Sequence, residues 1–105
     1  VRTMGASGFD TAKQFLRRAD GTLLIVGESI AFSNEPNNND VNLYYTLANG
    51  SIIKKTSLGG EGLEEGNGLA TLTDGRVVVV GSTSSHSSPF SQTKGNKDLF
   101  IAFWY

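Results

Sequence analysis

Short apolar runs separated by glycine and polar turn residues make up the hydrophobic pattern of this chain. Two runs, TLLIVG at Thr22–Gly27 and RVVVVG at Arg76–Gly81, are apolar at consecutive positions rather than at alternate ones. A strand with one face in water alternates apolar and polar residues, so we expect these two strands to be buried on both faces. Four consecutive β-branched valines also disfavour a helix. The pattern therefore predicts strands that lie between layers.

The remaining runs predict two units with strands in the same order. The first strand of each unit is expected at about 13–18 and 68–72, and an Asp-Gly dipeptide that suits a tight hairpin follows each one. After the second strand and a polar loop, the third strand is expected at 42–47 and 98–105. An Ala-Asn-Gly turn in the first unit leads to a fourth strand at 51–57. No segment has a sustained helical period with capping residues.

The two units form an internal repeat. LGGEGLEEGNGLATLTDGRVVVVGSTS, from Leu58 to Ser84, aligns without a gap with MGASGFDTAKQFLRRADGTLLIVGESI, from Met4 to Ile30, at an offset of 54 residues. After the polar loops the offset becomes 56 residues. The matched pairs include Phe15 and Leu69, Ile25 and Val79, Val26 and Val80, Gly27 and Gly81, Leu43 and Leu99, and Tyr44 and Phe100. Turn glycines and core residues match in one order, which disfavours chance identity.

A four-stranded antiparallel meander repeated at about 50 residues is typical of a β-propeller blade. We therefore expect an all-β fold of two four-stranded antiparallel propeller blades, within a single propeller segment covering 1–105. The first blade is expected at about 5–57 and the second at about 58–105. Because a propeller needs about 4–8 blades, the two would be part of a larger ring or of a head-to-tail oligomer. A two-sheet sandwich is the alternative local arrangement.

The second unit contains three predicted strands, and its fourth is missing. Residues 1–4 align with residues 55–58, the tail of the fourth strand in the first unit. We expect the last strand to expose unpaired backbone groups that template pairing with another chain. The expected partner is residues 1–4 of a neighbouring chain or of a further segment, and the alternative is that the remaining blades lie on sequence outside this chain. The residues assigned to this edge pairing are Val1, Arg2, Thr3, Met4, Phe103, Trp104 and Tyr105.

Composition narrows the classes of function. The chain has 9 Lys and Arg against 10 Asp and Glu, which is not the basic footprint of a nucleic-acid-binding protein. The absence of cysteine excludes a disulfide scaffold, a thiolate metal site and a cysteine nucleophile. No apolar run approaches the roughly 18 residues of a membrane-spanning helix. We therefore expect neither a nucleic-acid partner nor a membrane-spanning segment.

Candidate catalytic and metal-binding residues are few. His86 is the single histidine and has no orienting acid near it in sequence, so we expect a solvated loop residue. The loop at 35–42 collects oxygen donors that suit calcium but lacks the spacing of an EF-hand, which favours a polar turn-rich loop. The carboxylates Glu61, Glu64 and Glu65 are not fixed as a pair facing one cleft, as a glycosidase requires. No catalytic residue, cofactor or metal is expected.

Aromatic residues gather in the two third strands. Alternate residues of a strand face opposite sides, so about half of them face outward. The core between blades is the main expectation for this cluster, and stacking on sugar rings is the alternative. The candidate ligand-binding residues for that alternative are Tyr45, Trp104 and Tyr105.

These motifs together resemble the bacterial SBBP β-propeller repeats. LGGEGLEEGNGLATLTDGRVVVVGSTSSHSSPF and KDLFIAFWY in the second unit, and NLYYTLANGSIIKKTSLGG in the first, carry the resemblance over nearly the whole chain. The units differ at 12–14 and 66–68, where Ala-Lys-Gln stands in place of Gly-Asn-Gly, and at Asp10, where the second unit has Glu64. The resemblance implies a bacterial extracytoplasmic module, secreted, periplasmic or at the cell surface, without catalytic activity.

The expected function is a non-catalytic interaction or scaffold module. It would dock to a protein partner, or to further copies or blades of itself, through sheet edges and loops. The alternative is a lectin-like carbohydrate-binding propeller that uses aromatic residues at the blade interfaces.

Overall fold

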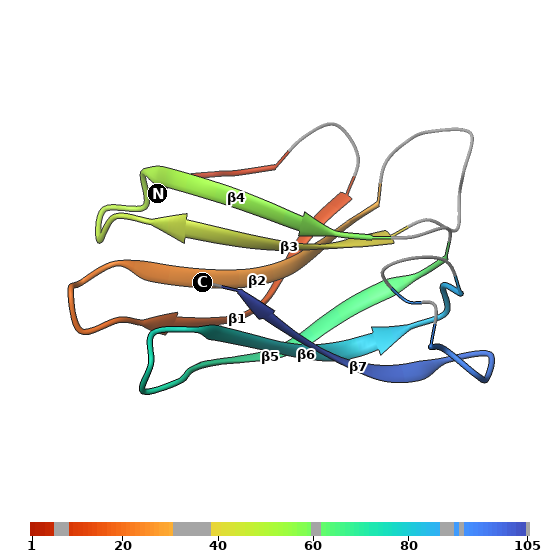
Figure 1. Cartoon of the computed structure of the whole chain (residues 1–105). Helices are drawn as coiled ribbons and strands as arrows, with labels where there is room; N and C mark the ends of the chain where they lie inside the picture. The colour runs from red at the N-terminus through yellow and green to blue at the C-terminus, as the bar shows by residue number, and fades with distance from the viewer. Residues whose placement is uncertain (6–8, 31–38, 60–61, 87–89, 91, 105) are drawn as a thin grey trace.

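The computed structural model describes residues 1–5, 9–30, 39–59, 62–86, 90 and 92–104. Within these residues the chain is all-β. The described part contains no helix, and therefore none that could span a membrane. The strands are β1 (Phe9–Arg17), β2 (Leu23–Ile30), β3 (Asn39–Thr46), β4 (Ile52–Leu58), β5 (Glu64–Thr71), β6 (Val77–Thr83) and β7 (Asp98–Trp104) (Figure 1). The predicted all-β class is confirmed.

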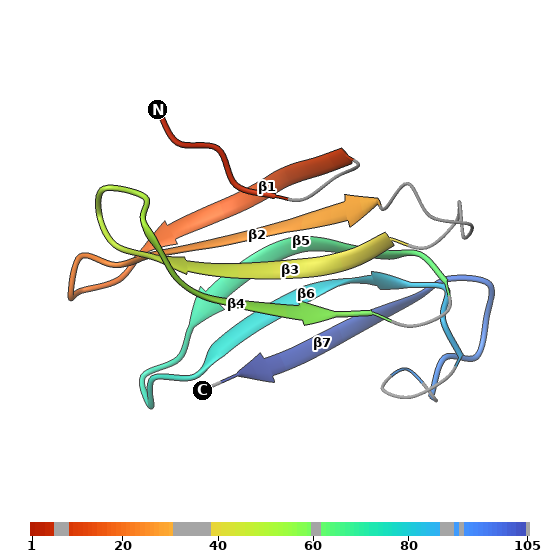
Figure 2. The ribbon, with the colours of Figure 1, turned by 90° about the horizontal axis from the view of Figure 1, so that it is seen from above.

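The strands form two antiparallel sheets. The first has the order β1-β2-β3-β4 and the second the order β5-β6-β7, each a simple meander (Figure 2). The predicted four-stranded meander is thus confirmed for the first unit. The second sheet has the three strands predicted for the second unit within this chain, so it differs from the complete four-stranded blade that is expected once a further strand is added. Residues 1–4, which align with the missing strand, lie beside the first sheet instead, where Arg2 Nε donates to the carbonyl of Asn49 at 2.8 Å.

The hairpins β1–β2, β3–β4 and β5–β6 have the same type of turn. In each, a glycine N–H donates to the carbonyl three residues earlier, and the glycine has the positive φ that a side chain disfavours. These glycines are Gly21, Gly50 and Gly75. The Asp or Asn before the glycine accepts the N–H of the residue after it, and these acceptors are Asp20, Asn49 and Asp74. The predicted Asp-Gly and Ala-Asn-Gly hairpins are confirmed.

Equivalent bulges in β1 and β5 explain one of the repeated glycines. The register shifts within 12–14 in β1 and within 66–68 in β5, positions that differ by the repeat offset. Each bulge moves a carbonyl oxygen over the neighbouring strand. A Cβ on Gly27 would overlap the carbonyl oxygen of Thr11, and a Cβ on Gly81 would overlap that of Glu65. The tripeptides that differ between the two units therefore occupy the same structural position.

The third strands are equivalent at a different offset from the one that the sequence alignment predicts. Gly27 of β2 pairs with Asn42, whereas its counterpart Gly81 of β6 pairs with Phe100. The structural counterpart of Asn42 is therefore Phe100, 58 residues later (100 − 42), and the predicted offset of 56 is wrong for these strands. A shift of two residues keeps every side chain on the same face, which is why the alignment still matches apolar positions with apolar ones.

The two sheets pack face to face, with β5 against β1, β2 and β3. A hydrogen bond joins the sheets, because Leu69 N donates to Gln14 Oε1 at 2.9 Å. The buried cluster between them consists of Leu24, Val26, Val41, Leu43, Leu69, Val77, Val79, Phe90 and Phe100. Face-to-face packing of this kind is common to both predicted arrangements, the sandwich and the pair of blades.

The central strands β2 and β6 are each well covered on one face only. Leu24 and Val26 of β2 are fully buried, and so are Val77 and Val79 of β6, all four pointing toward the other sheet. On the other face of β6, Val80 is 38% exposed. The prediction that these strands are buried on both faces is therefore met on one face, because the described residues form a single interface between sheets.

Candidate functional site: the open edge of β7

β7 is an edge strand of the second sheet. It pairs with β6 from Asp98, opposite Thr83, to Trp104, opposite Val77. On its other side no strand pairs with it in the described part of the chain. An edge strand presents a row of N–H and C=O groups that can accept a further strand. The edge strand includes Phe103 and Trp104, and Tyr105 lies outside the described residues; the pairing of this edge with a further strand stays a prediction.

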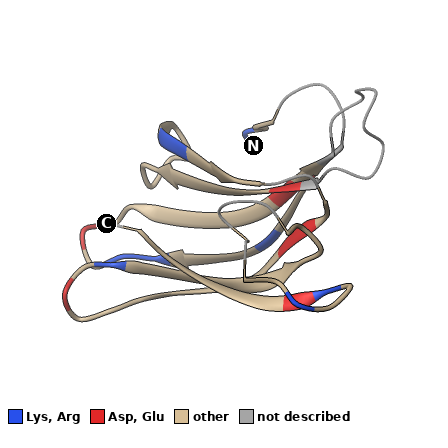
Figure 3. Ribbon diagram, turned by 45° about the vertical axis from the view of Figure 1, so that its right-hand side comes forward, with Lys and Arg blue, Asp and Glu red and all other residues tan. Residues whose placement is uncertain are grey.

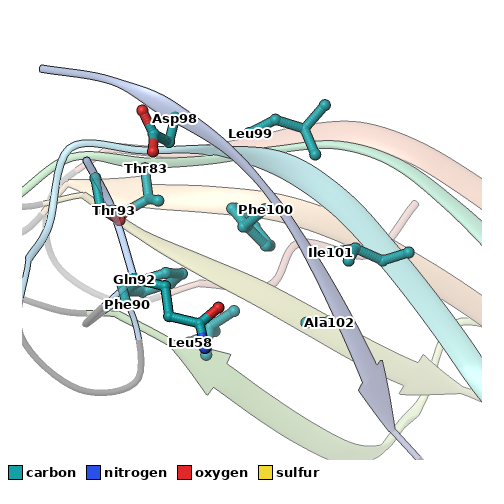
Figure 4. A pocket seen from close by; sticks show the side chains of 10 residues that line it. All are labelled: Leu58, Thr83, Phe90, Gln92, Thr93, Asp98, Leu99, Phe100, Ile101 and Ala102. Atoms are coloured by element: carbon teal, nitrogen blue, oxygen red, sulfur yellow. The ribbon is translucent and has the colours of Figure 1, made fainter. Parts of the chain in front are cut away.

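A cleft of about 350 Å³ runs along this edge (Figure 4). Five consecutive residues of β7, 98–102, line it. Because alternate side chains of a strand point to opposite faces, a cleft that contacts all five follows the edge of the strand rather than one face. The remaining lining residues are Leu58 at the end of β4, Thr83 of β6, and Phe90, Gln92 and Thr93 of the β6–β7 connection.

Phe90 fixes the wall of the cleft opposite β7. The ring of Phe90 is buried and lies 5.4 Å from the ring of Phe100 at 66°, an edge-to-face contact. Thr93 N donates to the carbonyl of Phe90 at 3.1 Å, which closes a turn. The carbonyl oxygen of Thr93 in turn lies 3.2 Å from Nδ1 of the exposed His86. These contacts hold the described part of the β6–β7 connection against the sheet.

Asp98 fixes the end of the cleft at the start of β7. Its Oδ2 accepts the N–H of Lys94 at 2.8 Å, and its Oδ1 accepts the N–H of Gly95 at 3.2 Å. Both carboxylate oxygens are thus engaged in holding the turn that leads into the strand. Asp98 has a structural role at this edge.

A buried carboxylate lies next to the cleft. Glu64 is fully buried, and its Oε1 accepts hydrogen bonds from Ser85 Oγ and from Thr83 Oγ1, the latter at 3.2 Å. The neighbouring Glu65 faces the opposite side of the sheet, where its Oε1 lies 3.3 Å from Lys97 Nζ. These two carboxylates do not share a cleft, and Glu61 lies outside the described residues.

The polar loop at 35–42 falls mostly outside the described residues, which include only its last part. There Asn42 is buried, and its Oδ1 accepts a hydrogen bond from Ser57 Oγ at 2.7 Å. Among the residues that the structure describes, no group of three or more His, Cys, Asp or Glu side chains is placed to hold a metal ion. The expectation of a polar, turn-rich loop stays a prediction, and calcium binding stays the less favoured alternative.

Tyr45 and Trp104, two candidates for stacking on sugar rings, face the space between the sheets. Both are partly buried and pack against the hydrophobic core. The hydroxyl of Tyr45 is buried, and this burial raises the pKa of Tyr45 above its usual value. Lys54 Nζ lies 5.5 Å from the centre of the Tyr45 ring. The structure thus places both aromatics in core packing, and carbohydrate binding stays a prediction.

The second sheet also leaves an apolar surface open, which the hydrophobic pattern alone did not identify. We call the side of this sheet that is turned away from the first sheet the back face; it carries Ala70, Val78, Val80, Leu99, Ile101 and Phe103. Leu99 is 80% exposed and Ile101 55% exposed. β6 contains no charged residue and β7 contains one, Asp98 at its start. Figure 3 colours the charged residues of the described chain. The continuous apolar run of β6 predicts burial of both faces, but it does not show that one of these faces stays open within the described residues.

Residues 1–4 lie over the outward side of the first sheet. We call this side the front face; it carries Phe15, Leu23, Ile25 and Tyr44. Arg2, Thr3 and Met4 line a cleft of about 370 Å³ together with Ile25 and Tyr44. The predicted pairing of residues 1–4 with β7 concerns a neighbouring chain or a further segment, so it stays a prediction.

Comparison with known proteins finds no match for this chain among protein-family models, curated proteins or solved structures.

Proposed function

We propose that this chain is a non-catalytic binding and scaffold module of the β-propeller type, and that the open edge of β7 is its docking site. The partner contributes an extended segment, which adds to the second sheet as a fourth strand. The observation that carries this proposal is the cleft that contacts five consecutive residues of β7, an edge strand with no second neighbour among the described strands.

The cleft offers both parts of strand recognition. The free backbone groups of β7 supply hydrogen bonds that do not depend on the partner's sequence, and pockets beside the strand select its side chains. Leu58 and Phe90 give this cleft an apolar wall, whereas Gln92 and Thr93 add polar groups. An alternating strand with one apolar face is therefore the expected ligand.

The propeller type is supported by the repeat and by the packing of the sheets. Two copies of one meander lie face to face, as neighbouring blades do. The position left open beside β7 is the position that β4 fills beside β3 in the first sheet. An extracytoplasmic location is proposed with it, on the resemblance to the SBBP repeats alone.

A synthetic peptide with the sequence of β4, IIKKTSL, tests the docking site directly. β4 is the fourth strand of the first unit, so its sequence is a natural substitute for the strand missing from the second. We expect saturable binding with a micromolar to millimolar dissociation constant, and amide NMR shifts confined to β7 and the walls of its cleft. The matched control is IIPPTSL, whose two prolines remove backbone N–H groups and should abolish binding.

Two results of this titration would overturn the proposed docking site. One is shifts centred on β1, β4 or β5, the other edge strands of the two sheets. The other is an absence of saturable shifts at millimolar peptide. Equal binding of the proline peptide would show that the contact does not depend on strand pairing.

A further inference from the structure

The internal repeat gives the residues of the back face counterparts in the first sheet. At the offsets that the strand pairing sets, Val80 and Ile101 on the back face correspond to Val26 and Leu43, which also pair with each other. Val26 and Leu43 are fully buried against the second sheet, whereas Val80 is 38% and Ile101 55% exposed. The back face thus repeats a surface that is completely covered in the first unit, and no described residue covers it in the same way.

The front face has the converse relation to the second sheet. Phe15 and Ile25 on the front face correspond to Leu69 and Val79. Leu69 and Val79 are buried against the first sheet, whereas Phe15 is 67% exposed and Ile25 is half-buried. The front face therefore repeats the surface that serves as the cover.

The contact between the two sheets is heterologous, because unlike sides of two equivalent units meet. A heterologous contact leaves both of its surfaces available again at the two ends of the stack. From this equivalence we infer that the back face docks on the front face of a second copy of the chain. The inference rests on the proposed function and names its partner. A row of such contacts forms either a closed ring or an open stack, depending on the rotation at each contact.

The charged residues of the two faces lie at their margins. Glu65 and Arg76 stand at opposite ends of the apolar part of the back face, and the Arg76 guanidinium lies 5.2 Å from the centre of the Phe103 ring. On the front face Asp10 and Asp40 lie near one end of the sheet, Arg17 lies at the other end of β1, and Lys55 lies on the edge strand β4. The apolar centres can therefore meet without burying a charge. Contiguous apolar patches of this kind mark interaction sites on soluble proteins.

The repeat also gives residues 1–4 a place in the stack. They correspond to residues 55–58, which pair with β3 from Lys55, opposite Tyr44, to Leu58. The same register on β7 places Val1 of the second copy opposite Ala102, within the cleft along this edge. Docking therefore moves these residues off their own front face and onto the edge of the neighbouring copy. One contact then fills both the open face and the open edge.

Two single variants test the heterologous contact. Ile101→Lys places a charge on the back face and Phe15→Lys places one on the front face, both at exposed positions that tolerate a polar side chain. We expect the wild type to associate above the chain mass of 11.2 kDa as concentration rises. Each variant alone should associate at least about tenfold more weakly. Their equimolar mixture should form a complex of twice the chain mass, because each variant retains the surface that the other lacks.

A control variant separates loss of this contact from a general effect of added charge. Leu47→Lys introduces the same charge at an exposed apolar residue in the β3–β4 turn, outside both faces, and should associate like the wild type. Circular dichroism checks that all three variants keep the all-β fold. A wild type that stays a monomer at millimolar concentration overturns the inference. Unchanged association of Phe15→Lys also overturns it, because that result indicates a back-to-back contact.

The register of residues 1–4 has a separate readout. The repeat places Arg2 of one copy opposite Ile101 of the other, and the chain has no native cysteine. Mixed Arg2→Cys and Ile101→Cys variants should form an intermolecular disulfide faster than Arg2→Cys mixed with Ile53→Cys, because only the first pair lies within bonding distance. Equal rates overturn this register. If the peptide binds β7 while the wild type stays a monomer, the proposed function stands and the second copy is the wrong partner.

Discussion

At the scale of single residues, backbone contacts determine where glycine is required. Gly27 and Gly81 lie beside the bulges of β1 and β5, where a neighbouring carbonyl oxygen occupies the space of a Cβ. The atoms in conflict belong to backbone on both sides, so a rotamer change cannot relieve the overlap. A repeated glycine that looks like a turn signal in the sequence is thus a feature of close strand packing.

Gly81→Ala should therefore lower the free energy of unfolding by about 1–3 kcal/mol, as overpacking does elsewhere. The matched control is Gly68→Ala, whose Cβ would meet mainly a methyl group of Val80 at 3.2 Å, and whose effect should stay within about 1 kcal/mol. Urea denaturation followed by fluorescence measures both values. Equal effects of the two substitutions would contradict the steric role of the bulge carbonyl.

The acidic turn residues are held by hydrogen bonds to their charged form. The Thr22 hydroxyl and then the Thr22 N–H bond to Asp20, and they lower the pKa of Asp20 below its usual 3.8. A carboxyl with a lowered pKa stabilises the fold above pH 3.8, and this contribution is lost as the pH falls through the lower folded-state value. Asn49 occupies the same position in another turn without a charge.

Asp20 and Asn49 together predict a difference in how the melting temperature of two variants depends on pH. Asp20→Ala should lower the melting temperature at neutral pH, and its difference from the wild type should shrink as the pH falls below 3.8. Asn49→Ala should lower the melting temperature by an amount that does not change over the same range. A parallel loss of both differences at low pH would show that the Asp20 charge is not responsible.

At the scale of strands, the order of elements was easier to predict than their contacts. The hydrophobic periodicity and the turn residues predicted all seven strands and three hairpins, because strands and hairpins depend mainly on residues that are close in sequence. The strands β1 and β5 begin about four residues earlier than predicted, since the bulge continues the pairing through a segment without an apolar run. The register of β7 differs by two residues from the aligned one, because turn and loop geometry sets the pairing. The walls of the β7 cleft were not predicted, because Leu58 and Phe90 come together only through tertiary packing.

The link between the two sheets gives a prediction at this scale. Gln14→Ala removes the acceptor of the Leu69 N–H, a hydrogen bond between β1 and β5, and should cost about 1–2 kcal/mol of unfolding free energy. Lys97→Ala offers a control, because it removes an exposed ion pair, with Glu65, that is worth less than about 1 kcal/mol. Denaturant unfolding compares the two variants. A larger loss for Lys97→Ala would contradict the assigned role of Gln14.

At the scale of the whole molecule, three surfaces remain uncovered among the described residues: the edge of β7, the back face and part of the front face. The repeat predicted the first from a missing strand, because strand count is visible in sequence. The back face and the front face could not be predicted in this way. They depend on which side of each strand is buried, and only the packing of the two sheets shows that. The proposed head-to-tail contact between copies would cover all three together.

Amide hydrogen exchange of β7 as a function of protein concentration tests the head-to-tail contact between copies most directly. In dilute protein the β7 amides that point away from β6 should exchange as fast as those of the hairpin turns, because they have no partner in the second sheet. As the concentration rises, the same amides should become protected together with the back-face residues. Two results would contradict this contact. One is that these amides are as protected as those of β6 in the most dilute sample, and the other is that the protein associates while they stay unprotected.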